Sequence, residues 1–306
     1  MRICVIGCGA VGSIFAAHLA GLEGVEVHAY DVARDHVQAI NERGLRLSGA
    51  ENFTARLHAT ADPEEIRHCD YGIVATKSVH TREAMAAAAR LFDESSAVCS
   101  VQNGVGNEEI LAEHVRYVIR GTTFPAGHLI EPGHVVYDIR GDTWIGPFEP
   151  SGTPMTRVEE LAAALTRSGM NTIALEDARG AQWTKLIFNA ATNPVGALTR
   201  LDHRAATLLP LTGDLFTALI EEGCAVARSL GIELHGDPRE LVRAGAQAPG
   251  KHQASMLQDV LAGRPTEIDF MNGAIVRAGE KAGVATPLNW ALWALVKGLE
   301  HSWTGP

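Results

Sequence analysis

The sequence contains no apolar run approaching the roughly 18–20 residues that a membrane-spanning helix requires. It also lacks an excess of positive charge, because 26 lysines and arginines stand against 36 acidic residues, a formal net charge of −10. Neither a membrane nor nucleic acid is therefore an expected partner. An apolar strand is predicted from residue 3, which leaves no room for a charged leader and a signal segment. We expect a soluble, cytoplasmic protein.

Cysteine is scarce and scattered. The chain has five cysteines, with no CxxC pair and no histidine at ligand spacing, so neither a disulfide framework nor a metal site is expected. Cys8 lies in a glycine-rich loop before a predicted helix, where its pKa would fall. Because no base neighbours it in the sequence, we interpret it as a packing residue rather than a nucleophile.

The 306 residues exceed most single cores, so two domains are expected. Residues 1–177 alternate short apolar strands with helices, which predicts a doubly wound, Rossmann-type α/β domain. Within it, residues 45–47 and 55–59 are predicted to pair, and antiparallel strands at 135–139 and 143–145 to close the edge of the sheet.

Residues 178–306 are predicted to form an all-α domain that binds substrate and carries catalysis, with the pocket between the two domains. Glycine and proline punctuation predicts its helices. They are 179–193 and onward, 207–229, 237–244, 252–262, 267–282 and 289–302.

A glycine-rich loop directly follows the first predicted strand and precedes a helix. In it Gly7 permits the tight turn, Gly9 lets the backbone approach a pyrophosphate, and Gly12 lets the helix pack close to the sheet. The helix N-terminus from Ala10 and Val11 onward would bind phosphate through its backbone N–H groups. The loop predicts a dinucleotide site; a nucleotide-free doubly wound fold is the alternative.

Asp31 ends the second predicted strand, where an acid would accept hydrogen bonds from the adenosine ribose and repel a 2′-phosphate. This favours NAD over NADP. Arg34, three residues on, could instead reach a 2′-phosphate, and Asp31 could simply cap the next helix.

Lys185, Asn189 and Asn193 recur every fourth residue and form one polar stripe on a predicted helix. Pro194 follows and should kink the helix by removing a hydrogen bond to residue 190. The stripe predicts the lining of a cleft, although an ordinary solvent-facing stripe fits the spacing equally well.

A second polar segment contains Ser255 within a predicted helix. Beyond it, Thr266 and Asp269 resemble a capping box that opens the next helix, which places Glu267 in the first turn. There the helix dipole would stabilise an acid in any case, so plain end-capping is the alternative for Glu267.

The glycine loop, residues 75–78 and 101–107, the lysine–asparagine helix and residues 255–269 together resemble the ketopantoate reductase (2-dehydropantoate 2-reductase) family. The resemblance implies a Rossmann domain followed by a helical domain like the C-terminal domain of 6-phosphogluconate dehydrogenase. It also implies reduction of a 2-oxo acid to a 2-hydroxy acid with NAD(P)H, in pantothenate biosynthesis. Many members that use NADP have an arginine near the end of the second strand, where this chain has Asp31.

Carried over by position, the family assigns roles to polar residues of both halves. Lys185 and Glu267 are implied to be catalytic, with the lysine as proton donor. The implied substrate-binding residues are Asn103, Asn189, Asn193 and Ser255. The implied cofactor-binding residues are Gly7, Cys8, Gly9, Ala10, Val11, Gly12, Asp31, Lys77 and Asn103.

The chemistry is coherent without the family, since an ammonium can stabilise the alkoxide made by hydride addition and deliver a proton to it. Two alternatives stay open: an NAD-dependent D-2-hydroxyacid dehydrogenase with the same catalytic set, and a nucleotide-sensing protein without catalysis. The Leu- and Trp-rich segment from Asn289 could close the core or form a homodimer face.

Overall fold

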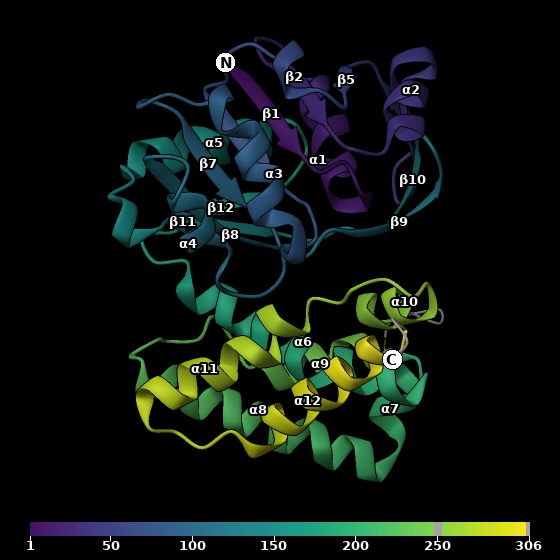
Figure 1. The fold of residues 1–306 in the computed structure, drawn as a ribbon, viewed down its shortest axis with the longest axis vertical. Coiled ribbons are helices and arrows are strands. Elements are labelled where there is room, and N and C mark those ends of the chain that lie inside the picture. Colours follow the sequence, from purple (N-terminus) through teal and green to yellow (C-terminus); the bar gives the residue numbers. More distant parts are fainter. Residues whose placement is uncertain (248–252, 304–306) are drawn as a thin grey trace. The chain divides into compact units, whose positions relative to one another are not determined.

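The computed structural model describes residues 1–247 and 253–303. The chain divides into two compact units, one formed by residues 1–102 and 107–178 and the other by 103–106 and the residues from 179 onward. Figure 1 shows the sheet unit in purple to teal and the helical unit mainly in green and yellow. Residues 103–106, which the sequence pattern assigns to the first domain, thus belong to the helical unit.

Among the described residues, the larger sheet of the first unit has eight strands in the order β12-β11-β8-β7-β6-β1-β2-β5. Strands β5, β2, β1, β6, β7 and β8 are neighbours in this order and run parallel. Strand β11 is antiparallel to β8, and β12 is parallel to β11. The strands are β1 (Arg2–Ile6), β2 (Glu26–Tyr30), β5 (His58–Thr60), β6 (Tyr71–Val74), β7 (Ala97–Ser100), β8 (Tyr117–Thr123), β11 (Thr143–Pro147) and β12 (Thr172–Ala174).

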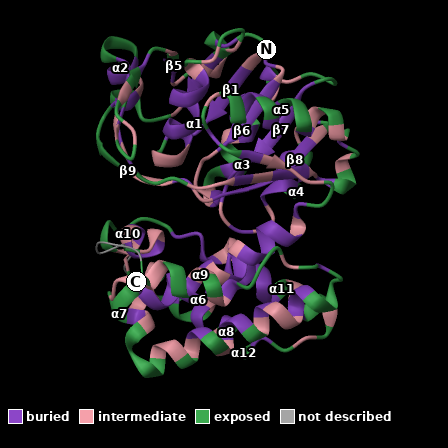
Figure 2. Cartoon of the chain, turned by 180° about the vertical axis from the view of Figure 1, so that it is seen from behind, coloured by how far each residue is buried: buried purple, intermediate pink, exposed green. Residues whose placement is uncertain are grey.

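The order β5-β2-β1-β6-β7-β8 is that of a Rossmann fold, as the sequence predicts. Every residue of β6 and β7 is buried, because helices cover both faces of a parallel sheet. Figure 2 shows these central strands as buried. The direction in which successive strands are added reverses between β1 and β6, and ligands of such sheets bind at this point, beyond the carboxyl ends of the strands.

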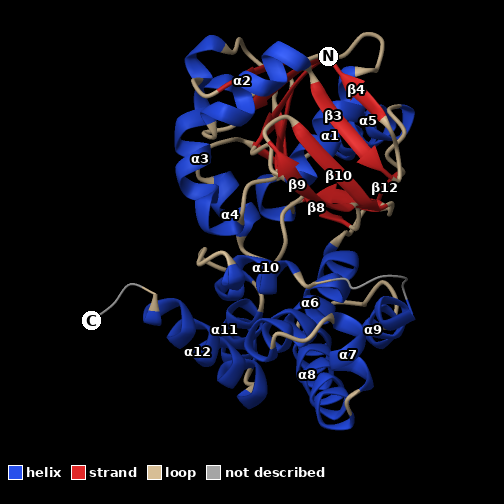
Figure 3. Ribbon diagram, turned by 90° about the vertical axis from the view of Figure 1, so that its right-hand side faces the viewer, coloured by secondary structure: helices blue, strands red, loops and turns tan. Residues whose placement is uncertain are grey.

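A second sheet of four strands, β4-β3-β10-β9, is separate from the first (Figure 3). Its strands are β3 (Leu45–Gly49), β4 (Phe53–Ala55), β9 (Ala126–Glu131) and β10 (His134–Ile139). Two predictions are corrected here. Residues 55–59 split between sheets, since β4 pairs with β3 while β5 pairs with β2, and residues 135–139 pair with β3 and β9 rather than with the edge of the large sheet.

Five helices of the first unit connect its strands. They are α1 (Ala10–Ala20), α2 (Arg34–Arg43), α3 (Thr81–Ala88), α4 (Asn107–Ala112) and α5 (Met155–Arg167). Helix α1 is nearly all buried, because it packs against strands of both sheets. Its amino end therefore lies at a fixed place after β1.

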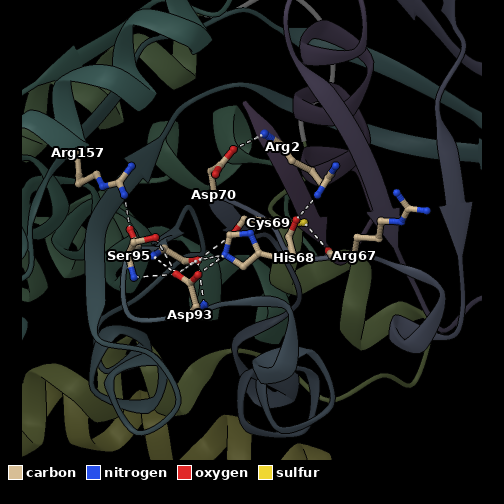
Figure 4. Close-up of polar contacts among 9 residues, drawn as sticks. Arg2, Arg67, His68, Cys69, Asp70, Asp93, Ser95 and Arg157 are labelled. Atoms are coloured by element: carbon tan, nitrogen blue, oxygen red, sulfur yellow. Dashed lines mark hydrogen bonds and ion pairs between the residues drawn. The ribbon is translucent and has the colours of Figure 1, made fainter.

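The amino ends of the parallel strands are held together by polar contacts (Figure 4). The backbone N–H of Arg2 donates to Asp70 Oδ2 at 2.7 Å, and the Arg2 guanidinium donates to the carbonyl of His68. Ser95 donates to Asp93 at 2.7 Å, which helps to hold the Asp93 pKa below its ordinary value. This end of the sheet is opposite to the glycine loop.

The second unit is helical, with a core of buried aliphatic and aromatic side chains such as Trp183, Phe216 and Ile275. Its helices are α6 (Arg179–Thr199), α7 (His203–Leu208), α8 (Pro210–Ser229), α9 (Pro238–Gln247), α10 (Ser255–Leu261), α11 (Asn272–Ala282) and α12 (Pro287–Ser302). The predicted helix 207–229 is divided at Leu209, because Pro210 has no N–H to continue α7 and instead begins α8. The predicted start at His252 lies outside the described residues.

Only one half of the predicted capping box at Thr266 forms: Thr266 Oγ1 accepts the Ile268 N–H at 3.3 Å, whereas the Thr266 N–H is bound by Glu300 rather than by Asp269. Thr266 donates its N–H and its hydroxyl to Glu300 Oε1, at 2.7 and 2.6 Å, and Asp269 accepts hydrogen bonds from Trp293 and Lys297. Residues Ile268–Phe270 form a 3₁₀ turn, and α11 begins only at Asn272. Glu267 therefore precedes a short turn instead of lying in the first turn of a long helix.

No helix among the described residues has the length and apolarity needed to cross a bilayer. The same part of the chain has no group of three or more acidic, histidine or cysteine side chains arranged to hold a metal ion.

Candidate active site

The glycine loop between β1 and α1 has the geometry of a phosphate cradle. Gly7 has φ +86°, and a Cβ there would lie 2.7 Å from the Thr76 nitrogen. A Cβ on Gly12 would lie 1.9 Å from the Gly7 carbonyl oxygen, so α1 can pack here only with glycine. By contrast, a Cβ on Gly9 would meet nothing within 4 Å. Gly9 therefore borders open space, where a ligand can approach the backbone.

The amino end of α1 is suited to an anion. Gly9 is its N-cap, and no side chain caps the helix. The N–H groups of Ala10, Val11 and Gly12 belong to the first turn, where an α-helix has no backbone acceptor for them. Phosphate oxygens can take that place, and the positive end of the helix dipole favours them. The cradle thus fits the pyrophosphate of a dinucleotide.

Asp31 follows β2 and contacts the glycine loop. Its Oδ2 accepts the backbone N–H of Cys8 at 2.6 Å, and its Oδ1 accepts that of Ala33 at 2.8 Å. Each carboxylate oxygen has a second acceptor position, so hydroxyl groups of a ribose can still bind. Arg34 is exposed at the start of α2.

His36 is a member of this site that the sequence analysis missed. The Gly133 N–H donates to His36 Nδ1 at 3.0 Å, so Nε2 carries the proton and faces Ser13 Oγ at 3.4 Å. Ser13 in turn donates to the Cys8 carbonyl at 2.8 Å. Burial lowers the His36 pKa, opposed by Asp31. His36 thus contacts the glycine loop through Ser13. This contact depends on the fold, and the only signal in the sequence is that His36 lies five residues after Asp31.

The two remaining cofactor candidates of the first unit differ in their setting. The Cys8 thiol is buried, and burial raises its pKa well above the ordinary value, with Asp31 adding to the effect. It is thus protonated and packed in the interior, and its backbone N–H serves the site. Lys77 is half-buried just beyond β6, next to Thr76 against which Gly7 packs.

Within the helical unit, Lys185 and Glu267 are joined through one amide. Lys185 Nζ donates to Asn103 Oδ1 at 3.0 Å, and Asn103 Nδ2 donates to Glu267 Oε2 at 3.2 Å. The lysine requires the oxygen of the amide and the carboxylate requires the nitrogen, so the orientation of Asn103 is defined. Residues more than 80 positions apart in the chain thus form one hydrogen-bonded series.

The electrostatics of this series suit proton transfer. Burial lowers the Lys185 pKa to about 8, and Glu267 opposes that fall. The Glu267 side chain is itself buried. Near neutral pH Lys185 is an ammonium that can lose its proton readily, as a general acid must.

Asn103 is held in place by its loop. The N–H of Val105 donates to the Phe270 carbonyl at 2.9 Å, and Gln182 Nε2 donates to the Gly104 carbonyl at 3.3 Å. Gly104 has φ +86°, and a Cβ on it would lie 2.3 Å from the Phe270 oxygen. Gln182 is a second residue that the sequence analysis missed, although it lies one turn before Lys185 on the same helical face.

The other substrate candidates form a second series along α6. Asn193 Nδ2 donates to Asn189 Oδ1 at 3.2 Å, and Asn193 Oδ1 accepts the Ser255 hydroxyl at 3.2 Å and the Met256 N–H at 3.3 Å. Asn189 and Asn193 are buried, so the polar stripe does not face solvent. The stripe therefore carries two hydrogen-bonded sets, one at Lys185 and one at Asn193.

A Rossmann-type cradle with an acid after β2, together with a half-buried lysine of lowered pKa, defines an oxidoreductase that uses a nicotinamide cofactor. The comparisons with known proteins agree. Residues 3–150 match the family described as Ketopantoate reductase PanE/ApbA, and residues 177–300 match its C-terminal family. The chain belongs to the ketopantoate reductase family.

Relatives and solved structures match nearly the whole chain. The 2-dehydropantoate 2-reductase of Archaeoglobus fulgidus is 36% identical over 299 residues, 98% of each chain. A PanE/ApbA family ketopantoate reductase from Ralstonia eutropha has a TM-score of 0.89 at 32% identity, covering 99% of this chain and 100% of that one. D-mandelate dehydrogenase, solved with NADH and anilino(oxo)acetate, has a TM-score of 0.90 at 28% identity with the same coverage.

Proposed function

We propose that this protein is a 2-dehydropantoate 2-reductase, which reduces the ketone of this 2-oxo acid to the 2-hydroxy acid. The hydrogen-bonded series Lys185–Asn103–Glu267 supports the proposal, because it holds an ammonium of lowered pKa, the kind of group that this reduction requires as a proton donor. Curated reductases at 36% identity over nearly the full length support the substrate.

When bound, a reduced nicotinamide would supply the hydride for the ketone carbon. Lys185 donates a hydrogen bond to the ketone oxygen, stabilises the negative charge that develops on it, and transfers a proton to form the new hydroxyl group. Asn103 orients the lysine, and Glu267 keeps it charged. Asn189, Asn193 and Ser255 supply amide and hydroxyl groups that orient the substrate.

NAD is the cofactor that we propose, held by the residues around the glycine loop. Asp31 accepts hydrogen bonds from the adenosine ribose, and its charge would repel the 2′-phosphate of NADP. Lys77 and Asn103 contribute to cofactor binding near the reacting carbonyl. The first unit thus provides the dinucleotide domain and the second the catalytic domain.

The test is a screen of 2-oxo acids against NADH and NADPH that follows the loss of nicotinamide absorbance. We expect ketopantoate with NADH to have the highest kcat/KM. Failure to reduce ketopantoate with either cofactor would overturn the proposed activity, whereas a clear preference for NADPH would overturn only the cofactor assignment.

The second candidate is an NAD-dependent D-2-hydroxyacid dehydrogenase. The likeness to D-mandelate dehydrogenase with NADH, together with Asp31, favours it. The two candidates separate in the same screen if aromatic 2-oxo acids are included, because a dehydrogenase of this kind would reduce these faster than ketopantoate.

A further inference from the structure

Helix α6 continues through a proline in the middle of its polar stripe. Pro194 has no N–H, so it cannot donate the hydrogen bond that the carbonyl of Ala190 would accept in a regular helix. Nevertheless α6 extends unbroken from Arg179 to Thr199, and Ala190 is buried away from water. A buried carbonyl without a donor costs stability, so another donor is needed.

Asn272, the first residue of α11, supplies that donor. Its Nδ2 donates to the Ala190 carbonyl at 2.9 Å and to Asn289 Oδ1 at 3.0 Å. Because both partners accept, the nitrogen and oxygen of this amide cannot be exchanged. Asn289 Nδ2 then donates to the half-buried Glu222 Oε2 at 2.8 Å, so one polar series joins α6 to α11, α12 and α8.

The Asn272 amide satisfies a requirement that an apolar side chain would not meet. Asn272 is fully buried, and its Oδ1 has no hydrogen-bond partner in the described chain. Burying an unpaired amide oxygen is unfavourable. The chain accepts this cost at a position from which Nδ2 reaches the Ala190 carbonyl.

The contact also lies between the two polar sets of the active site. Ala190 directly follows Asn189, and Pro194 directly follows Asn193. Asn272 follows Glu267 by five residues, with the 3₁₀ turn between them. The bond from Asn272 to Ala190 therefore fastens the segment that carries Glu267 to the part of α6 that carries the two asparagines.

We propose that Asn272 is a positioning residue of the active site, whose amide replaces the helix hydrogen bond that Pro194 cannot donate and so holds Asn189 and Asn193 in register with Glu267. Its effect on substrate binding rests on the proposed function. The hydrogen bond itself does not, and the two can be tested separately.

The test is a double-mutant cycle in the full chain, with Asn272→Leu, which removes the amide at similar volume, and Pro194→Ala, which restores an N–H at residue 194. In the unaltered Pro194 background, we expect Asn272→Leu to raise KM for ketopantoate about tenfold, the order expected for a lost buried hydrogen bond. KM for the cofactor should stay within about twofold, because its proposed ligands lie mainly in the other unit. In the Pro194→Ala background the same substitution should raise the ketopantoate KM less than about threefold.

The unfolding midpoint in urea gives a second readout that requires no substrate. Asn272→Leu should lower this midpoint more in the unaltered Pro194 background than in the Pro194→Ala background. As a matched control, Asn41→Leu removes another side-chain amide that donates to a backbone carbonyl, that of Ala59 at 2.7 Å in the sheet unit. Its effect should be the same in both backgrounds, because Asn41 and Pro194 share no partner.

The proposal would be overturned if Asn272→Leu lowered the urea midpoint equally in the two backgrounds. It would also be overturned if this substitution raised KM equally for ketopantoate and for the cofactor. A chain with Asn272→Leu that folds only together with Pro194→Ala would support it. If neither folds, Asn272→Ser in both backgrounds gives the same comparison. If ketopantoate is not reduced by the unaltered chain, the proposed function fails, while the urea midpoints still decide the role of Asn272.

Discussion

Asp31 Oδ2 accepts the backbone N–H of Cys8 at 2.6 Å, so the acid at the end of β2 is fastened to the glycine loop at the end of β1. The contact joins two parts of the cofactor site that the sequence shows separately. It also brings the carboxylate to the loop where we propose that the dinucleotide binds.

Replacing Asp31 with Asn should change the choice of cofactor. The amide keeps the size of the side chain but removes the charge that repels a 2′-phosphate, so the preference for NADH over NADPH should fall roughly tenfold to a hundredfold. Steady-state kcat/KM with each cofactor measures this ratio. An unchanged ratio would show that Asp31 does not discriminate between the cofactors.

Gly9→Ala and Gly12→Ala should fail in different ways. The methyl group at Gly9 enters open space, so the chain should fold normally while KM for the cofactor rises by roughly tenfold or more, because the group blocks approach to the backbone. At Gly12 the methyl would collide with the Gly7 carbonyl, which should lower the unfolding midpoint. Thermal unfolding and cofactor titration on both variants separate the effects, and similar behaviour of the two would contradict this assignment.

Lys185→Ala should lower kcat by roughly 10²–10⁴-fold, the usual contribution of a general acid, with little change in cofactor affinity. Steady-state kinetics and cofactor titration of this variant measure both quantities, and an unchanged kcat would contradict the role of Lys185.

In the unaltered protein, the rate of reduction should decline as the pH rises through about 8, since the Lys185 ammonium loses its proton there. Glu267→Gln removes the charge that raises this pKa, so the decline should occur at lower pH. A pH profile of kcat for both proteins tests this, and a profile unmoved by Glu267→Gln would exclude the coupling.

Acid should weaken cofactor binding through His36. Its neutral ring accepts the Gly133 N–H, and its pKa lies below the ordinary value of 6.5. Above that pKa the contact is intact; as the pH falls through it, protonation puts a second donor against the N–H. The KM for the cofactor should rise in that range. His36→Asn retains an acceptor that does not titrate, so its cofactor KM should lose this dependence; if the dependence persists, it arises elsewhere.

Much of the fold is predictable from local pattern. Glycine spacing after an apolar strand predicted the cradle, and the alternation of strands and helices predicted the parallel sheet. The spacing of Lys185, Asn189 and Asn193 predicted that they share one face of a helix. These features depend on backbone geometry over a few residues, so the sequence by itself determines them.

Partners that are distant in the chain were decided only by the tertiary structure. The sequence predicts that Pro194 removes a hydrogen bond to residue 190. It does not predict that Asn272 donates to the Ala190 carbonyl instead. It predicts Asp269 as the partner of the Thr266 N–H, whereas Glu300 accepts that hydrogen bond. Nor does it show that Asn103 would join Lys185 to Glu267. A polar group can bond to whichever complementary group packing brings near, and that choice is made by the assembled helices rather than by neighbouring residues.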